Sequence, residues 1–265
     1  MDLQLTGKRA IVTGGSRGIG KAVARALAAE GCDVVVAARG ANALAESAQE
    51  LAAATGRTVV PIAVDTGDDE SVRAMVAGAV DTLGGVDILV NAAARPLGQS
   101  APPKLADVTG DLFWDDMNVK VLGYLRCAQA VAPHLVEQGW GRIINISGLG
   151  ARSTGAVIGS MRNVAVAAMT KNLADELGPH GVTVTVVHPG LTRTEATPGV
   201  VERIAHARAI SPEDAERSLA TNSIGRIVDA AEVADVVTFL ASPRSGAING
   251  DAIACGGGQR GVIHY

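Results

Sequence analysis

The sequence predicts an α/β fold in which one doubly wound parallel sheet lies between two layers of helices, within a single domain of 265 residues. Short β-branched segments alternate with longer amphipathic segments along the chain. The short segments are apolar throughout, which is typical of strands covered by helices on both faces. No linker, repeat or low-complexity stretch divides the chain, so we expect one three-layer αβα unit.

The expected strands occupy residues 10–12, 33–37, 58–64, 86–90, 142–146 and 182–187, with a last short strand within 248–254. The expected helices occupy residues 19–30, 41–55, 68–83, 111–138, 159–177 and 230–241. A strand followed by a helix and then by another strand produces parallel neighbours, because the helix carries the chain back along the sheet. The order of the elements therefore predicts a parallel sheet.

Two of these helices have few polar residues. Between Val119 and Ala132 the polar or small residues are Lys120, Gly123, Arg126 and Gln129, which form one narrow stripe, and 164–169 has no polar residue. A helix that is apolar nearly all round is buried on more than one side. We expect a homo-oligomer, a dimer or tetramer, formed through helices 111–138 and 159–177. The alternative is that segment 190–225 of the same chain covers them.

Composition excludes several classes of function. The formal net charge is -4 with scattered basic residues, whereas a nucleic-acid partner calls for a clustered basic face. No apolar run of 18 residues and no leader pattern occurs, so we expect no membrane partner and a cytoplasmic location. Cys32, Cys127 and Cys255 have no C-x-x-C spacing and are interpreted as buried thiols. The five histidines show no ligand spacing, so no metal site is expected.

A glycine-rich loop joins the first strand to the first helix. Its sequence from Thr13 to Gly20 is TGGSRGIG, with the spacing G-x-x-x-G-x-G. Glycines allow a tight turn and let backbone N–H groups approach a pyrophosphate at the positive N-terminus of the helix. The loop thus predicts a Rossmann-type dinucleotide site, whose expected residues are Gly14, Ser16, Arg17, Gly18, Ile19 and Gly20.

Over nearly its full length the chain resembles the short-chain dehydrogenase/reductase family. The motifs that carry the resemblance are the loop 13–20, Asp65 after the third strand, Asn91-Ala92-Ala93-Ala94 after the fourth, Asn118, the segment 141–147 (GRIINIS), Pro189-Gly190 and Gly256-Gly257. Ala94 departs from the pattern, because the family usually has Asn-Ala-Gly there. The resemblance implies an oxidoreductase that acts on a carbonyl or alcohol group with a nicotinamide cofactor.

The resemblance also implies contacts to that cofactor. Asp65 and Thr66 are expected at the adenine, and Asn91, Ala92 and Ala93 along the adenosine. The nicotinamide end is expected to contact Pro189, Gly190 and Thr192, and Thr194 fits the family pattern Pro-Gly-x-x-x-Thr.

The sequence further indicates NADP(H) in preference to NAD(H). NAD enzymes place a carboxylate at the end of the second strand for the ribose 2′-hydroxyl, whereas NADP needs a cation there. That strand ends in Ala37-Ala38-Arg39-Gly40, and Arg17 in the glycine loop adds a second cation. A guanidinium suits a phosphate through its paired donors.

The expected catalytic residues are largely missing. The family normally uses a Tyr as the acid/base, a Lys four residues later, a Ser that orients the carbonyl and an Asn that supports a proton relay. Tyr124 and Tyr265 are the two tyrosines of the chain, and neither has a Lys four residues later. The run 163–171 (NVAVAAMTK) resembles the family's Lys-Ala-Ala-Val-x-x-Leu-Thr-Lys, which places Gly159 at the tyrosine position and Asn163 at the lysine position.

Two of the four positions are retained. Asn118 matches the relay asparagine, and Ser147 matches the serine, with Gly148 as the alternative match. Asn163 can hydrogen-bond the cofactor ribose but cannot supply a lysine's charge. Reduction of a carbonyl requires a proton donor within hydrogen-bond reach.

Three hypotheses therefore remain open. The first is an oxidoreductase with atypical proton delivery, with Ser147, Ser160, Arg162, His188 or water as the donor. The second is an NADP(H)-binding protein without redox activity that serves as a sensor or an oligomer partner. The third is a non-redox enzyme that reuses the pocket. The partner is a small molecule of unknown identity, and its contacts are expected in loops 95–110, 149–158 and 192–221.

Overall fold

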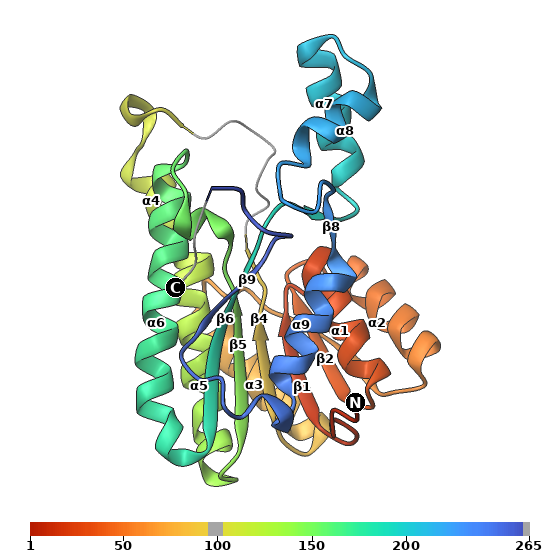
Figure 1. Ribbon diagram of the computed structural model, residues 1–265. Helices are drawn as coiled ribbons and strands as arrows, with labels where there is room; N and C mark the ends of the chain where they lie inside the picture. Colours follow the sequence, from red (N-terminus) through yellow and green to blue (C-terminus); the bar gives the residue numbers. More distant parts are fainter. Residues whose placement is uncertain (95–102, 262–265) are drawn as a thin grey trace.

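A parallel sheet of seven strands forms the centre of the protein in the computed structural model, which describes residues 1–94 and 103–261. The strand order is β3-β2-β1-β4-β5-β6-β9, so the chain winds outward in both directions from β1. This confirms the predicted doubly wound fold (Figure 1). The strands are β1 (Arg9–Thr13), β2 (Asp33–Ala38), β3 (Val59–Ala63), β4 (Ile88–Asn91), β5 (Gly141–Ile146), β6 (Val182–Pro189) and β9 (Ala252–Cys255).

Helices cover both faces of this sheet. Helices α1 (Gly18–Ala29), α2 (Ala41–Thr55) and α9 (Ala230–Ala241) pack on one face, and α3 (Asp69–Leu83), α5 (Gly123–Glu137) and α6 (Val157–Leu177) pack on the other. Successive residues of one strand enter opposite cores, as Val34 and Val35 of β2 do. The inner strands are therefore buried on both sides, which explains their largely apolar sequences, whereas the edge strands β3 and β9 are partly exposed.

The predicted helix 111–138 is interrupted. Helix α4 (Gly110–Met117) continues into one π-helical turn, η2 (Asn118–Leu122), before α5 begins. A π turn holds an extra residue and so rotates the side chains that follow. As a result Lys120 is only 4% exposed, and the predicted polar stripe with Gly123, Arg126 and Gln129 is wrong at its first residue. Gly123 is buried as well.

Two polar helices follow the short strand β7 (Thr192–Arg193). Helices α7 (Thr197–Arg208) and α8 (Pro212–Leu219) pack on each other through a small cluster that includes Val201, Ala205 and Ala215. The chain then enters β8 (Val228–Asp229), which pairs with β7. Figure 1 shows α7 and α8 projecting beyond the carboxyl edge of the sheet, on the side of α9 and away from α4 and α6.

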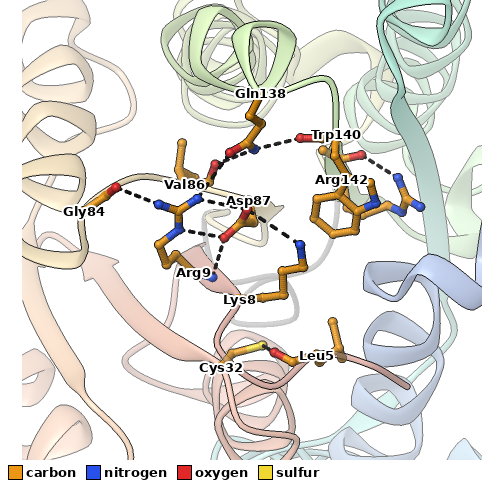
Figure 2. A network of polar contacts seen from close by, with 11 residues as sticks. Leu5, Lys8, Arg9, Cys32, Gly84, Val86, Asp87, Gln138, Trp140 and Arg142 are labelled. Carbon is orange, nitrogen blue, oxygen red and sulfur yellow. Dashed lines mark hydrogen bonds and ion pairs between the residues drawn. The ribbon is translucent and has the colours of Figure 1, made fainter. Parts of the chain in front are cut away.

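A polar network closes the amino edge of the sheet (Figure 2). The Arg9 guanidinium donates to Asp87 through Nε at 2.7 Å and to the carbonyl of Gly84 at 2.6 Å. Gln138 accepts from Arg9 and donates to the carbonyls of Val86 and Trp140. The network ties β1, β4 and the end of α5 together at the edge opposite the glycine loop.

Short helical turns complete the described chain: η1 (Leu105–Asp107), η3 (Leu149–Arg152), η4 (Gly178–His180) and η5 (Pro243–Ser245). Among the described residues no helix is long and apolar enough to cross a membrane, and no three His, Cys, Asp or Glu side chains gather as a metal site would require. Residues 95–102 of the first expected substrate loop lie outside the described residues.

Candidate cofactor and active site

The glycine-rich loop packs tightly between three elements. Gly14 N and Gly15 N both donate to the carbonyl of Ala37 at the end of β2, at 2.7 and 3.3 Å. Gly14 has a φ of +69°, and a Cβ there would lie 2.8 Å from the carbonyl oxygen of Ala92. A Cβ on Gly20 would lie 2.3 Å from the Gly14 carbonyl oxygen. Both positions therefore require glycine, as a close approach of loop, strand and helix demands.

The start of α1 already binds an anionic oxygen. Gly18 N donates to Oε2 of Glu195 at 3.0 Å, while the residue that precedes the helix, Arg17, provides no side-chain cap. Ser16 and Ile19 are half-buried beside it. A carboxylate at a helix N-terminus is stabilised by the helix dipole and by the free N–H groups, and a pyrophosphate is stabilised in the same way. The loop residues thus fit a dinucleotide.

Thr13 and Asn91 hold the ends of β1 and β4 together. Thr13 Oγ1 accepts hydrogen bonds from Ala92 N at 3.1 Å and Ala93 N at 3.2 Å. The Asn91 side chain is fully buried and donates to Oδ1 of Asn145 at 2.9 Å. Of the expected adenosine contacts, Ala92 and Ala93 line the loop, whereas the Asn91 amide joins the central strands.

The expected adenine contacts lie next to Asn118. Asp65 Oδ1 accepts from Gly67 N at 2.9 Å, and Thr66 Oγ1 donates to the carbonyl of Val119 at 3.1 Å. Asn118 Nδ2 donates to the carbonyl of Gly67 at 3.2 Å. The structure therefore brings Asp65, Thr66 and Asn118 together, with the Thr66 side chain buried and the Asn118 amide fixing the loop after β3.

The nicotinamide-end motif turns sharply after β6. Gly190 N donates to the carbonyl of Cys255 at 3.2 Å, and a Cβ on Gly190 would lie 2.9 Å from the Cα of Gly256. Thr192 Oγ1 donates back to the Gly190 carbonyl at 3.1 Å. Pro189 ends β6, and the Thr194 methyl group lies 3.5 Å from the position of a Cβ on Gly18. This segment thus borders the glycine loop.

Arg17 and Arg39 are exposed at the same corner of the molecule. Arg39 follows Ala37, whose carbonyl binds the glycine loop, and Gly40 precedes α2 without a side-chain cap. No ion pair or hydrogen bond holds either guanidinium within residues 1–94 and 103–261. Two cations and a helix N-terminus therefore gather beside the loop.

Ser147 and His188 are engaged by the backbone. Ser147 is 8% exposed, and its Oγ donates to the carbonyl of Asn163 at 3.1 Å. Nδ1 of the buried His188 lies 2.9 Å from the Gly148 carbonyl oxygen. Gly148 and Gly150 have no side chains, and a Cβ on either would lie 3.2 or 3.1 Å from Nδ2 of Asn163.

Arg162 extends back along α6 beside Gly159. A Cβ on Gly159 would lie 4.0 Å from Nη2 of Arg162, so the guanidinium borders the space that the glycine opens. Nη1 donates to both carboxylate oxygens of Asp116, at 2.7 and 2.8 Å. The side chain is fully buried, and Nε and Nη2 have no partner among the described residues.

Sequence reasoning did not single out Lys120 as a site residue. Its Nζ donates to the Ser147 carbonyl at 3.0 Å and to Oδ1 of Asn163 at 3.4 Å. Burial, and next the charge of Arg162, lower the pKa of Lys120 to about 7 against the opposing charge of Asp116. The π turn that buries Lys120 cannot be recognised from the apolar pattern of the sequence. The one sequence signal that pointed to Lys120 as a site residue was its position two residues after Asn118.

Known proteins resemble this chain in sequence over nearly its whole length. Residues 14–260 match the family described as Enoyl-(Acyl carrier protein) reductase. The short-chain reductase protein NovJ of Streptomyces niveus is 38% identical over 252 residues, which cover 94% of this chain and 93% of the relative. The 3-oxoacyl-[acyl-carrier-protein] reductase FabG of Vibrio cholerae is 33% identical and covers 97% of this chain and 99% of its own.

The chain is a short-chain dehydrogenase/reductase. Solved structures of this family superpose closely. L-sorbose reductase from Gluconobacter frateurii, complexed with NADPH and L-sorbose, gives a TM-score of 0.92 at 28% identity over 99% of this chain and 100% of that one. Actinorhodin polyketide ketoreductase with NADPH gives 0.88 at 32% identity over 96% and 98% of the two chains.

Membership makes the protein an NAD(P)-dependent oxidoreductase with a nicotinamide cofactor. Neither tyrosine of the chain is followed four residues later by a lysine. The assignment of Gly159 and Asn163 to the family's Tyr and Lys positions stays a prediction from the sequence, and the structure adds that the buried Lys120 of η2 donates to Asn163.

Proposed function

We propose that the protein is an NADP(H)-dependent reductase of a small ketone, with a proton delivered by a group other than tyrosine. The observation that carries the proposal is the anion-binding start of α1, where Gly18 N already holds a carboxylate oxygen. The exposed guanidiniums of Arg17 and Arg39 beside it supply charge for a 2′-phosphate. NADPH, when bound, supplies the hydride.

The residues of the chain divide the work of binding. The loop Gly14–Gly20 offers backbone N–H groups to the pyrophosphate, and Arg17 and Arg39 distinguish a phosphate from a hydroxyl. Asn163 offers its amide to the ribose, because the neighbouring Gly148 and Gly150 have no side chains that would cover Nδ2. Pro189, Gly190 and Thr192 border the nicotinamide end.

The proton is proposed to come from neither Ser147 nor His188. The Ser147 hydroxyl hydrogen is given to the Asn163 carbonyl, and His188 Nδ1 is engaged with the backbone of Gly148. A neutral serine is also a poor acid near neutral pH. These contacts leave the ionisable groups of η2 and α6 as the candidates.

A ketone is proposed as the substrate class because relatives with this fold reduce oxo groups. L-sorbose reductase was solved with a sugar, and the FabG relative is named for a 3-oxoacyl group. The space beside Gly159 is open apart from the Ala156 methyl group and the Arg162 guanidinium. A substrate that presents an oxygen there would face a positive charge.

The proposal is tested by loss of NADPH absorbance with a panel of sugar ketones, 3-oxoacyl thioesters, simple ketones and quinones. We expect turnover with at least one member of the panel. Binding of NADPH without turnover across the whole panel would contradict the proposed activity.

Cofactor choice is tested by Arg39→Ala. Loss of one charge-assisted contact costs about 1.5–3 kcal/mol, so the Kd for NADPH should rise about 10- to 100-fold while the Kd for NADH changes less than about threefold. Cofactor fluorescence measures both values. Arg73→Ala, which removes an exposed arginine of α3, is the matched control. Equal losses for the two cofactors would contradict the assignment.

A further inference from the structure

We infer that Lys120 is the general acid of this enzyme and delivers the proton to the substrate oxygen, directly or through one water molecule. The inference rests on the proposed reductase function. Its geometric basis is the contact of Nζ with the Ser147 carbonyl at 3.0 Å and with Oδ1 of Asn163 at 3.4 Å. An ammonium carries three hydrogens, so one remains for a further acceptor.

The π turn is what directs Lys120 to this place. Helix α4 ends at Met117, and η2 turns Lys120 away from the polar stripe of α5 and into the gap between η2, β5 and α6. π turns inside helices are frequent at functional sites, because they place a side chain that a regular helix would point elsewhere.

Lys120 is buried, and its two partners are slightly more exposed than it is. Ser147 and Asn163, its two partners, are 8% and 5% exposed, and Gly148 and Gly150 place no side chain over the Asn163 amide. Ser147 follows the carboxyl end of β5, and Asn163 lies one helical turn after Gly159 on α6. On this inference a ligand oxygen, or one water molecule, meets the ammonium beside these glycines.

Burial, more than the neighbouring charges, makes Lys120 a usable acid near neutral pH. Burial lowers its pKa to about 7, with Arg162 of α6 acting in the same direction and Asp116 of α4 opposing it. The other ionisable groups of this region are Tyr124 of α5, whose hydroxyl donates to the Ile146 carbonyl, and His188 of β6, bound to Gly148. An acid works best with a pKa near the working pH.

The chemical balance of the step is simple. NADPH, when bound, would supply the hydride and be oxidised to NADP+, so its C–H bond would break. The carbonyl carbon gains that hydride with its electron pair, the carbon–oxygen π bond breaks, and the oxygen takes a proton from Nζ. The substrate thus gains one C–H and one O–H bond, and one N–H bond of Lys120 breaks. Lys120 is left as a neutral amine, which regains a proton from solvent. Arg162, whose Nε and Nη2 have no partner among the described residues, stabilises the negative charge that develops on the oxygen.

The first test compares Lys120→Met with Lys120→Arg. General acids contribute about 10²- to 10⁴-fold, so we expect kcat to fall by that factor in Lys120→Met while the Kd for NADPH stays within about threefold. Lys120→Arg keeps the charge but cannot release a proton near pH 7, so its kcat should also fall at least about tenfold. Lys171→Met, on the exposed face of α6, is the matched control and should leave kcat unchanged.

The pH profile separates an acid from a structural cation. In the native enzyme kcat/KM for reduction should fall about tenfold per pH unit above pH 7, because the protonated amine is consumed, and this limb should vanish in Lys120→Arg. Native kcat in Lys120→Arg, or an unchanged alkaline limb in Lys120→Met, overturns the assignment. An enzyme that binds NADPH but reduces no substrate fails the proposed function instead, and the acid role falls with it.

Two measurements do not depend on turnover. The chain has five lysines, so ¹³C-labelled lysine side chains give a simple NMR spectrum in which the resonance absent from Lys120→Met is Lys120. The midpoint of its titration is expected near pH 7, and a midpoint near pH 10 overturns the inference.

The second measurement is the stability of the fold as a function of pH. Because the pKa of Lys120 in the folded protein lies below the unfolded value of 10.5, Lys120 lowers the stability most below pH 7 and ceases to do so as the pH rises to 10.5. Lys120→Met should therefore stabilise the fold at pH 7 more than at pH 10.

Discussion

Asp116 balances two buried cations. Its carboxylate receives Nη1 of Arg162 through both oxygens, and its charge raises the pKa of Lys120 against the effect of burial. The Arg162 side chain is 1% exposed and that of Asp116 is 17% exposed. The Asp116 carboxylate is therefore needed for Arg162 to be buried as a cation. A buried cation without a counter-charge destabilises the fold by its full desolvation free energy.

The Asp116 cluster gives a stability prediction. Asp116→Asn leaves Arg162 without a counter-charge and should lower the free energy of unfolding by about 3–5 kcal/mol, measured by urea denaturation. The double variant Asp116→Asn/Arg162→Gln should recover part of that loss, because it contains no unpaired guanidinium. A single variant that costs less than about 1 kcal/mol, or a double variant that is worse than the single, would contradict this account.

Among the elements, the turn between β7 and α7 carries a carboxylate that competes with the cofactor for the N-terminus of α1. Glu195 lies in this turn and binds Gly18 N, the group that we assign to the pyrophosphate. Glu195→Gln removes the charge that repels a phosphate while it preserves the shape of the side chain. The Kd for NADPH should fall about three- to tenfold at low salt and approach the native value at high salt, because added ions screen the repulsion.

The control for this element lies on α7. Glu202→Gln neutralises an exposed carboxylate in the next helix and should leave the Kd unchanged. Fluorescence titration at two salt concentrations measures both variants. Weaker binding by Glu195→Gln would show that the carboxylate supports the loop rather than competing at it.

Most elements could be predicted from the sequence because their signals are local. The helix 230–241 matches α9 at both ends, and β1, β2 and β4 coincide with nearly continuous apolar runs. The cofactor loop was equally visible, since glycine spacing directly reflects close backbone contacts. Helices α7 and α8 were not assigned, because their mostly polar sequence buries only a small cluster of side chains.

For the catalytic centre, the sequence predicted which family residues are missing but not which residue replaces them. The absence of a Tyr and Lys pair is a fact of sequence, but its replacement depends on contacts between segments that are far apart. Lys120 and Asn163 are 43 residues apart and meet only because η2 adds a residue to one helical turn. No periodicity reports such a turn, so the amphipathic pattern placed Lys120 on the wrong face.

For the molecule as a whole, stability and chemistry lie at opposite edges of the sheet. Arg9, Asp87 and Gln138 fasten the amino edge, where Lys8 also lies 3.9 Å above the Trp140 ring (Figure 2). The carboxyl edge carries the glycine loop, the buried lysine and α7. This separation lets the loops that bind ligands vary while the sheet stays fixed.

Helices α4 and α6 and the turn η2 carry an exposed apolar face, which we propose binds a second copy of the chain. Val157, Met161 and Val164 are 49%, 51% and 50% exposed and lie on one side of α6, as their spacing of four and three residues requires. The neighbouring helices α4 and η2 expose Leu112, Trp114 and Leu122. Figure 1 shows α4 and α6 together at one side of the molecule, away from α7 and α8.

Light scattering after gel filtration should therefore give a dimer or tetramer. The double variant Met161→Glu/Val164→Glu should dissociate it, because two charges cannot be buried unpaired at an apolar contact. Ile224→Glu changes a side chain that is also 50% exposed but lies outside these helices, and should leave the mass unchanged. A native protein that is monomeric at micromolar concentration would contradict the proposal. Because α6 also carries Asn163 and Arg162, we expect dissociation to lower NADPH turnover as well, and the same variant measures both effects.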